Sequence, residues 1–302
     1  VFTGSVRTGK AVAKAAAENL VPVSLELGGK DAAIVCNDAD VQRSAAGIAW
    51  GAFHNTGQNC AAIERVYVED LVYDAFVAEL VAQTQALRTG GSADLAEVGP
   101  LCNEQQFNIV RRQLEQAVAG GATVLCGGEP TGEGFGFQPT VVIDAPEDCD
   151  LWREETFGPV LPVMKVHSAF EAVDRTNDSP YGLSVSVWGQ ETGRAQMVGQ
   201  RCDVGMALIN NHAFTGSVPT SPWVGRKDSG TGVTGSHLAM KFLTRPQLVV
   251  VDTSKAKELW WFPLNQPVLD IARTALDALV APLGRRISLT LKLLGLLGKR
   301  WS

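Results

Sequence analysis

The spacing of apolar and polar residues along the chain predicts alternating helices and strands. Residues 41–53, 71–87 and 103–119 repeat apolar side chains at the spacing of one helical face. Shorter helical runs cover 11–20, 170–175 and 194–200. Between the helices lie short apolar runs typical of strands, at 23–27, 32–36, 65–68, 123–126, 141–143, 160–165, 184–188 and 206–209. This alternation indicates an α/β fold with a largely parallel sheet.

The composition is that of a globular protein, and the net charge argues against one class of binding partner. At 302 residues the chain is long enough for about two domains, with 45% hydrophobic and 19% charged residues. Its formal net charge of −6 argues against a nucleic-acid partner, which normally meets a basic surface. The six cysteines form no CxxC pair and no Cys/His cluster. We therefore expect reduced thiols, no metal site and a cytoplasmic location.

The last segment, residues 254–302, differs from the rest in charge. Eight Lys and Arg against three Asp and Glu give it +5, which leaves −11 for the preceding residues. Helical runs at 268–280 and 287–297 are flanked by basic residues. Such a basic amphipathic extension fits weak contact with an anionic membrane surface. The alternative is packing on its own body or on a neighbouring subunit.

Two residues suggest covalent chemistry. Cys60 follows a Gly-containing turn, and Glu26 lies 34 positions before it. A thiolate can attack an electrophilic carbon, and the resulting intermediate is released by water that a base has activated. Because the two residues are too far apart to share one helix face, we expect tertiary structure to bring them together.

Six motifs resemble those of the aldehyde dehydrogenase superfamily and occur in the same order. They are Phe2-Thr-Gly-Ser, Leu25-Glu-Leu-Gly-Gly-Lys, Asn55-x-Gly-Gln-x-Cys60, Glu155-x-Phe-Gly-Pro159, Asn177-x-x-x-Tyr-Gly-Leu183 and Lys227-x-Ser-Gly-x-Gly232. The resemblance covers residues 2 to about 252. It implies an α/β fold of the aldehyde dehydrogenase type with Rossmann-type parallel sheets, and we expect that fold to be incomplete at the N-terminus. It also implies NAD(P)-dependent oxidation of an aldehyde to a carboxylic acid.

The resemblance assigns roles to both candidate residues. Cys60 matches the nucleophile that forms a thiohemiacetal and then a thioester, and Glu26 matches the general base of thioester hydrolysis. The presence of Glu26 favours hydrolysis of the thioester over transfer of its acyl group to coenzyme A. The alternatives are a buried structural thiol and a surface glutamate. The Cys60 N–H is expected to hold the oxyanion, together with an asparagine from a segment preceding this chain.

Other matched positions imply where the cofactor and the substrate bind. Gly4, Ser5, Gly9 and Leu27 lie in or beside the motifs on the pyrophosphate side. Glu155 and Phe157 match residues beside the nicotinamide and its ribose. The cofactor is NAD or NADP, with NAD favoured.

Trp223 occupies an aromatic position that often lines the substrate tunnel. Val224 after it replaces the family's glycine, which leaves the path of this loop open. His212 and Phe214 are weaker candidates for substrate contact.

The resemblance also implies a division into domains. Residues 1–28 would end a dinucleotide-binding domain, 29–230 would form the catalytic domain, and 231–253 would return and pair with another subunit. A dimer or tetramer is expected because the apolar strand near 247–252 needs cover. Two alternative functions remain: a catalytically inactive or scaffolding fragment, and cofactor-independent ester hydrolysis by Cys60 and Glu26.

Overall fold

The computed structural model describes residues 1–91, 95–132, 134–258 and 261–297. The chain divides into two compact units, Val1–Arg245 and Pro246–Ser302, and each is described here by itself. The first unit contains all six sequence motifs.

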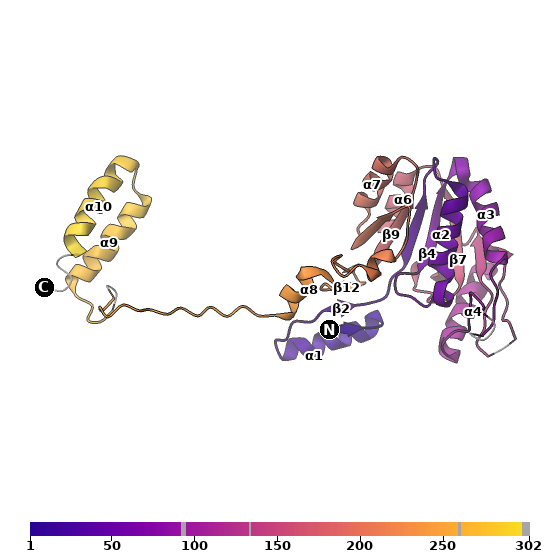
Figure 1. Ribbon diagram of the computed structural model, residues 1–302, viewed down its shortest axis with the longest axis horizontal. Helices are drawn as coiled ribbons and strands as arrows, with labels where there is room; N and C mark the ends of the chain where they lie inside the picture. The colour runs from indigo at the N-terminus through magenta and orange to yellow at the C-terminus, as the bar shows by residue number, and fades with distance from the viewer. Residues whose placement is uncertain (92–94, 133, 259–260, 298–302) are drawn as a thin grey trace. The chain divides into compact units, whose positions relative to one another are not determined.

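A seven-stranded sheet is the centre of the first unit (Figure 1). Its strands are β3 (Asp31–Val35), β4 (Ile63–Glu69), β5 (Thr123–Cys126), β6 (Thr140–Ile143), β7 (Val160–Val166), β9 (Ser184–Trp188) and β10 (Met206–Ile209). They are ordered β10-β9-β3-β4-β7-β6-β5, and all neighbours are parallel except β5 and β6. The predicted α/β fold with a parallel sheet is confirmed.

Helices cover both faces of this sheet. Successive side chains of a strand point to opposite faces, so each strand contributes apolar residues to both layers. Ala33 and Val35 of β3 pack in one buried cluster with residues of two helices, α2 (Val41–Phe53) and α3 (Tyr73–Gln85). Ala32 and Ile34 pack in the other cluster. The helices on that second face are α4 (Glu104–Ala119), α5 (Asp150–Arg153), α6 (Ala169–Asn177) and α7 (Thr192–Arg201).

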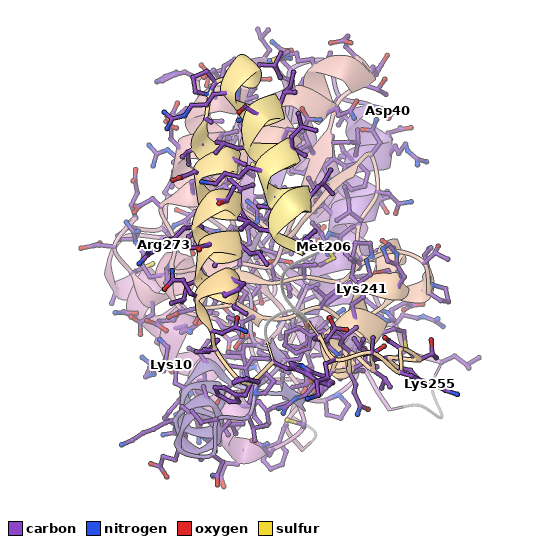
Figure 2. The ribbon with its side chains drawn as sticks, turned by 90° about the vertical axis from the view of Figure 1, so that its left-hand side faces the viewer. Lys10, Asp40, Met206, Lys241, Lys255 and Arg273 are labelled. Carbon is purple, nitrogen blue, oxygen red and sulfur yellow. The ribbon has the colours of Figure 1, made fainter. Side chains whose placement is uncertain are left out.

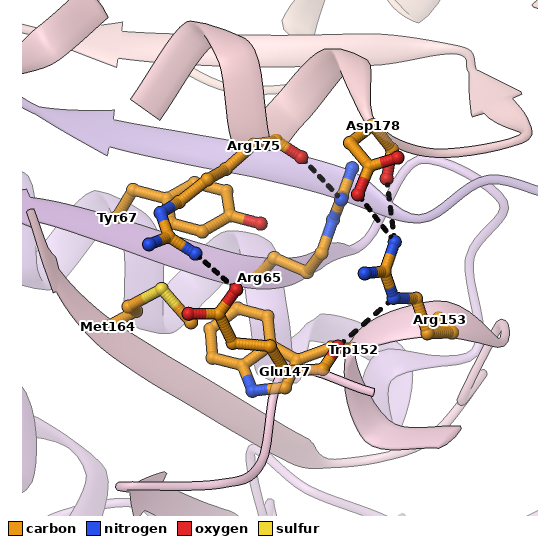
Figure 3. Close-up of a pocket in the computed structure, with 8 residues that line it drawn as sticks. All are labelled: Arg65, Tyr67, Glu147, Trp152, Arg153, Met164, Arg175 and Asp178. Carbon is orange, nitrogen blue, oxygen red and sulfur yellow. Dashed lines mark hydrogen bonds and ion pairs between the residues drawn. The ribbon is translucent and has the colours of Figure 1, made fainter. Parts of the chain in front are cut away.

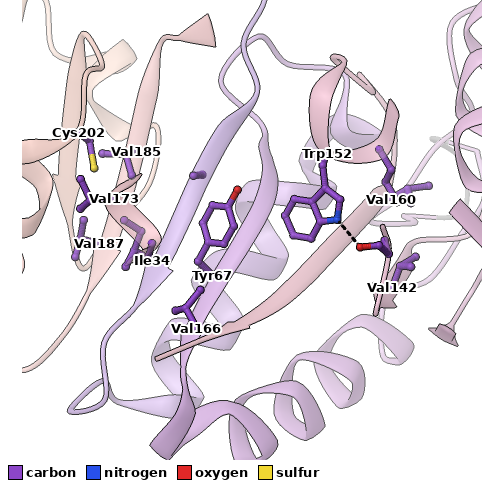
Figure 4. Packing of buried hydrophobic residues seen from close by; sticks show 14 of the residues in the cluster. Ile34, Tyr67, Val142, Trp152, Val160, Val166, Val173, Val185, Val187 and Cys202 are labelled. Atoms are coloured by element: carbon purple, nitrogen blue, oxygen red, sulfur yellow. Dashed lines mark hydrogen bonds between the residues drawn. The ribbon is translucent and has the colours of Figure 1, made fainter. Parts of the chain in front are cut away.

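The second cluster contains a stacked pair of aromatic rings (Figure 4). Tyr67 and Trp152 stack with their ring centroids 5.6 Å apart, and the Trp152 indole N–H donates to the Ala145 carbonyl. This hydrogen bond lets the indole lie in an apolar layer without an unpaired polar atom.

A small second sheet carries the start of the chain. Its strands are β1 (Phe2–Thr3), β2 (Leu25–Glu26) and β12 (Gly230–Thr231). The middle strand β2 pairs in parallel with β1 and antiparallel with β12. Helix α1 (Val6–Glu18) connects β1 to β2.

Several short elements were not predicted. Strand β8 (Tyr181–Gly182) pairs with β11 (Arg226–Lys227), and α8 (Ser236–Leu243) ends near the limit of the first unit. The predicted helix 71–87 begins instead with the 3-10 turn η2 (Asp70–Val72).

The second unit contains a helical hairpin of α9 (Gln266–Val280) and α10 (Leu283–Leu297). The Asn265 side chain accepts from the Val268 N–H and begins α9. None of the helices in the described ranges is both long and apolar enough to cross a membrane. Residues 247–252 lie in no strand of the single chain. Pairing of this segment with another subunit stays a prediction, as do the predicted domain boundaries.

Candidate active site

Cys60 follows a tight left-handed turn that begins where α2 ends. Asn55, Thr56 and Gly57 have φ angles of 52°, 63° and 71° in the 3-10 turn η1 (His54–Gly57). Asparagine and glycine tolerate this region, whereas threonine adopts it at an energetic cost. The Thr56 hydroxyl donates to the Gly99 carbonyl, which holds this residue in place. The turn thus fixes the approach of the chain to the nucleophile.

The Cys60 backbone N–H is available to a ligand. It has no hydrogen-bond partner in the described part of the chain, whereas Ala61 N donates to the Asn59 side chain and Ala62 N to the Asn59 carbonyl. The Asn59 oxygen also lies 3.7 Å from the Cys60 Sγ. The nucleophile's own amide can therefore donate to an oxyanion.

Cys60 is a protonated thiol at neutral pH. Burial, together with the nearby carboxylates of Asp31, Glu155 and Glu26, raises its pKa to about 11. The Ala61 N–H lowers it only in part. Attack by this sulfur therefore requires a group that accepts its proton.

Glu26 is a buried carboxylate without partners. Its side chain on β2 is 7% exposed, and neither oxygen has a hydrogen-bond partner among the described residues. Burial raises its pKa to about 7. Thr234 and Trp223 lie close enough to lower this pKa slightly, although neither makes a hydrogen bond of ordinary geometry. A carboxylate in this state can both accept and release a proton near neutral pH.

Two glycines after Glu26 allow the other site residues to come close. A Cβ on Gly28 would lie 2.4 Å from a Glu155 carboxylate oxygen, and one on Gly29 would lie 2.4 Å from the Cys60 carbonyl. The Gly29 N–H donates to Glu155 at 3.1 Å. The segment after the base therefore contacts both the nucleophile loop and the carboxylate predicted to hold the ribose.

A buried ion pair holds the loop that carries Glu155 and Phe157. Glu64 accepts at 2.7 Å from the Lys30 ammonium, from the Thr156 N–H and from the Phe157 N–H. Lys30 also donates to the Thr156 hydroxyl, and its own pKa is lowered by burial. Phe157 has φ 49°, so these bonds maintain an unfavourable backbone conformation.

Glu64 is a site residue that the sequence did not reveal. It lies between Ile63 and Arg65 in a strand, four positions after Cys60. Its position in a strand, four residues after the candidate nucleophile, was the feature of the sequence that could have indicated its role. Its partners are 34, 92 and 93 residues away along the chain, so its role depends on the fold.

The residues predicted on the pyrophosphate side meet at the start of α1. Ser5 caps this helix by accepting from the Thr8 N–H, and Gly9 packs against the Leu27 side chain. Gly4 N donates to the Glu26 carbonyl. The helix start therefore lies beside β2, and its first N–H groups suit an anion.

Apolar residues line the space beside the thiol. Cys60 and Trp223 both pack against a cluster of Ala61, Leu183, Met206 and Leu208. Val224 does not have a positive φ, so this backbone position suits a β-branched residue as well as the family's glycine.

His212 supports the nucleophile loop instead of facing substrate. Its ring is buried, and Nε2 lies 2.6 Å from the Ala61 carbonyl. Burial lowers its pKa to about 4, so the ring is neutral and Nε2 donates. The side chain of Phe214 lies outside the described part of the structure.

A separate arginine-lined cavity contains none of the predicted site residues. It measures about 30 Å³ and lies among Arg65, Tyr67, Glu147, Trp152, Arg153, Met164, Arg175 and Asp178 (Figure 3). Arg153 pairs with Asp178 at 2.8 Å, and Arg175 with Glu147 at 2.6 Å. The cavity is of the size of one water molecule. We interpret it as part of a structural ion-pair network.

Comparison with known proteins agrees with this geometry. A model of the aldehyde dehydrogenase family matches residues 1–249. The chain is 36% identical to a 4,4'-diapolycopene aldehyde oxidase of Methylomonas sp, over 87% of this chain and 49% of that protein. It is 39% identical to a succinate-semialdehyde dehydrogenase [NADP(+)] of Deinococcus radiodurans, over 85% of this chain and 54% of that protein.

A solved structure has the same fold. The NADP-dependent glyceraldehyde-3-phosphate dehydrogenase of Bacillus halodurans, complexed with NADP, superposes with a TM-score of 0.79 and 37% identity. The match covers 84% of this chain and 52% of that one. The chain spans about half the length of the curated relatives it matches.

Proposed function

The chain belongs to the aldehyde dehydrogenase family, and from this premise we propose that it oxidises an aldehyde to a carboxylic acid with NAD or NADP. One observation supports this most strongly. Glu26, a buried and unpartnered carboxylate with a pKa of about 7, lies close enough to Cys60 to raise the thiol's pKa.

The first step makes a bond between sulfur and carbon. Glu26 takes the thiol proton, and the Cys60 Sγ attacks the aldehyde carbon to form a thiohemiacetal. The former carbonyl oxygen becomes an oxyanion, which the free Cys60 N–H stabilises. Trp223 and the apolar cluster around it exclude water from the organic part of the substrate.

The chain offers groups that fit a nicotinamide cofactor. The Ser5-capped start of α1 presents N–H groups suited to a phosphate, and the Glu155 carboxylate beside Gly28 can accept from ribose hydroxyls. The bound cofactor would accept the hydride whose loss converts a thiohemiacetal into a thioester. Glu64 and Lys30 hold the loop that carries Glu155 and Phe157.

The second step releases the acid. Glu26 removes a proton from water, the resulting hydroxide attacks the thioester carbon, and the carbon–sulfur bond breaks. The products are a carboxylic acid and the Cys60 thiolate, which regains a proton. Glu26 passes the thiol proton to solvent before this step, so one aldehyde, one water and one oxidised cofactor give one acid, one reduced cofactor and one proton.

Ester hydrolysis tests the nucleophile and the base in this chain without a cofactor. With 4-nitrophenyl acetate, we expect a burst of one nitrophenolate per chain followed by steady turnover. Cys60→Ser should abolish both phases. Glu26→Gln should slow the burst, because the thiol loses its proton acceptor, and should slow the steady phase by about 10²- to 10³-fold, because deacylation loses its base.

The exposed thiol Cys102 provides a matched control. Cys102→Ser should change neither phase. A burst that survives in Cys60→Ser would refute the assigned nucleophile.

Oxidation itself is tested by adding an aldehyde with NAD or NADP and following absorbance of the reduced cofactor. Ester turnover without any reduced cofactor would favour the cofactor-independent esterase. Failure of both reactions would favour the inactive or scaffolding alternative. The expected preference for NAD stays a prediction, since relatives include NADP-dependent enzymes.

We further propose that the chain forms a homo-oligomer in the cytoplasm. The side chains of Leu248, Val249, Val250 and Val251 are each at least 71% exposed in the single chain. An apolar extended segment of this kind is normally covered by another strand. Light scattering that gives a monomer at micromolar concentration would contradict this proposal.

A further inference from the structure

The helical hairpin of the second unit has an inner apolar face where its two helices meet. Val268 and Ile271 of α9 and Ala281 of the connection are buried, and the two helices lie side by side (Figure 1). The connection is two residues long, so the helices run antiparallel. On α10 the half-buried side chains are those of Leu289, Leu293, Leu296 and Leu297.

Each helix also carries a second apolar stripe, which no described residue of its unit covers. The stripe residues are at least 61% exposed. They are Leu276, Leu279 and Val280 of α9, and Leu283, Ile287, Leu291 and Leu294 of α10. The α10 residues follow the spacing i, i+4, i+8 and i+11, which places them on one face.

The two outer stripes lie on the same side of the hairpin. At 3.6 residues per turn, each stripe is rotated by about 130° from its own inner face, in the same sense along the chain. Two antiparallel helices are related by a twofold axis normal to their common plane. An equal rotation in the same sense therefore brings both stripes to one side, which we call the outer apolar face.

Charged residues lie away from this face. Asp270, Arg273 and Asp277 follow the polar side of α9, and Arg285 and Lys292 follow that of α10. Figure 2 shows Arg273 on the flank of α9 that is turned away from α10. Arg286 donates to the carbonyls of Ala281 and Leu279 at the connection.

Two further observations describe the partner. Residues 254–302 carry a charge of +5 in a chain of −6. Trp261 and Phe262, which precede α9, are 50% and 81% exposed. Exposed aromatic and aliphatic residues next to excess positive charge are the combination that binds anionic lipid headgroups and the outer part of the acyl layer.

We propose that the outer apolar face lies in the surface of an anionic lipid bilayer. Charge favours the bilayer over a second copy of the hairpin, because two copies would bring two positively charged tails together. The proposal is independent of the proposed enzyme activity, since it involves none of the active-site residues.

Vesicle flotation of the full chain tests the proposal. We expect at least about tenfold stronger binding to vesicles of phosphatidylcholine and phosphatidylglycerol in equal parts than to phosphatidylcholine alone, with partial release at high salt. Leu276→Gln/Leu291→Gln should lose this binding without changing net charge. Arg285→Gln/Lys292→Gln should reduce the preference for anionic vesicles.

Leu71→Gln/Leu95→Gln is the matched control, because both residues are highly exposed leucines of the first unit. It should bind vesicles like the unchanged chain. Circular dichroism checks that every variant keeps its helices. The proposal is wrong if the unchanged chain does not float with anionic vesicles, or if Leu276→Gln/Leu291→Gln floats equally well. It is also wrong if that variant only converts a dimer into a monomer, which would identify a second copy as the partner.

Discussion

Two glutamates of the first unit are equally buried and opposite in their surroundings. Glu64 is 3% exposed and accepts from an ammonium and two backbone N–H groups. Glu26 is 7% exposed and has no hydrogen-bond partner among the described residues. Burial is therefore not what distinguishes them.

The difference separates a positioning role from a chemical one. A carboxylate with its hydrogen bonds complete stays ionised and fixes whatever donates to it. A carboxylate without partners has a raised pKa and is free to exchange protons with a bound water or a thiol. Glu155 lies between the two cases, with one N–H donor and a pKa that burial raises to about 7.

The largest expected effect is that of Glu64→Gln on stability. The neutral amide leaves the Lys30 charge buried without a counterion and turns an NH₂ group toward a backbone N–H. We expect the free energy of unfolding to fall by about 3–5 kcal/mol, measured by urea denaturation at pH 8. The matched change Glu97→Gln removes an exposed ion pair with Arg88 and should change the free energy of unfolding far less.

Glu26→Gln should raise the free energy of unfolding, whereas Glu64→Gln lowers it. The pKa of Glu26 is about 7 in the folded chain and about 4.5 when exposed, so folding takes up a proton between these values. The free energy of unfolding therefore falls as pH rises from about 4.5 to 7 and stays low above it. Glu26→Gln should be more stable by about 3 kcal/mol at pH 8 and unchanged at pH 4.

Denaturation of both forms at these two pH values measures the difference. Equal stability of Glu26→Gln and the unchanged chain at pH 8 would show that the carboxylate has partners in solution. Glu26 and Glu64 would then not differ in whether their carboxylates have hydrogen-bond partners.

The pH dependence of ester turnover refines the assignment of the base. Only ionised Glu26 activates water, so steady turnover should rise about tenfold per pH unit below 7 and level off above it. The burst amplitude should stay at one equivalent. A plateau that already begins at pH 5 would point to a base with an ordinary carboxyl pKa.

The smallest expected effect concerns Glu155. In Gly28→Ala the new methyl group meets the Glu155 carboxylate, which must move aside. We expect about tenfold weaker NAD binding by fluorescence titration and a stability change of about 1 kcal/mol or less, because a side chain yields more easily than backbone. Gly284→Ala, where no atom lies within 4 Å of the added carbon and the backbone has no positive φ, should leave NAD binding unchanged.

The sequence predicted the long elements better than the short ones. Helix α2 and strands β5, β9 and β10 begin and end where the apolar pattern predicts. Strands β8, β11 and β12 are two residues long, too short to show a period of two, and were missed. Their pairing depends on loops that meet only in the folded chain.

The sequence motifs predicted the residues that we propose to react, but not the residues that hold them in position. Cys60 and Glu26 stand out by residue type and spacing, and in the structure Glu26 lies close enough to Cys60 to raise the pKa of the thiol. Glu64 and His212 act through groups of distant segments, so their roles depend on the fold, and the position of Glu64 four residues after Cys60 gave only a weak local signal.

The three-stranded sheet that carries Glu26 has a consequence for how the chain acquires activity. Its strands come from residues 2–3, 25–26 and 230–231, so Glu26 is flanked by Thr3 on one side and Gly230 on the other. Closing so long a loop is slow. One strand partner of Glu26 is therefore absent until more than 200 further residues have been synthesised, and a chain that ends before residue 230 lacks this side of the strand that carries the base.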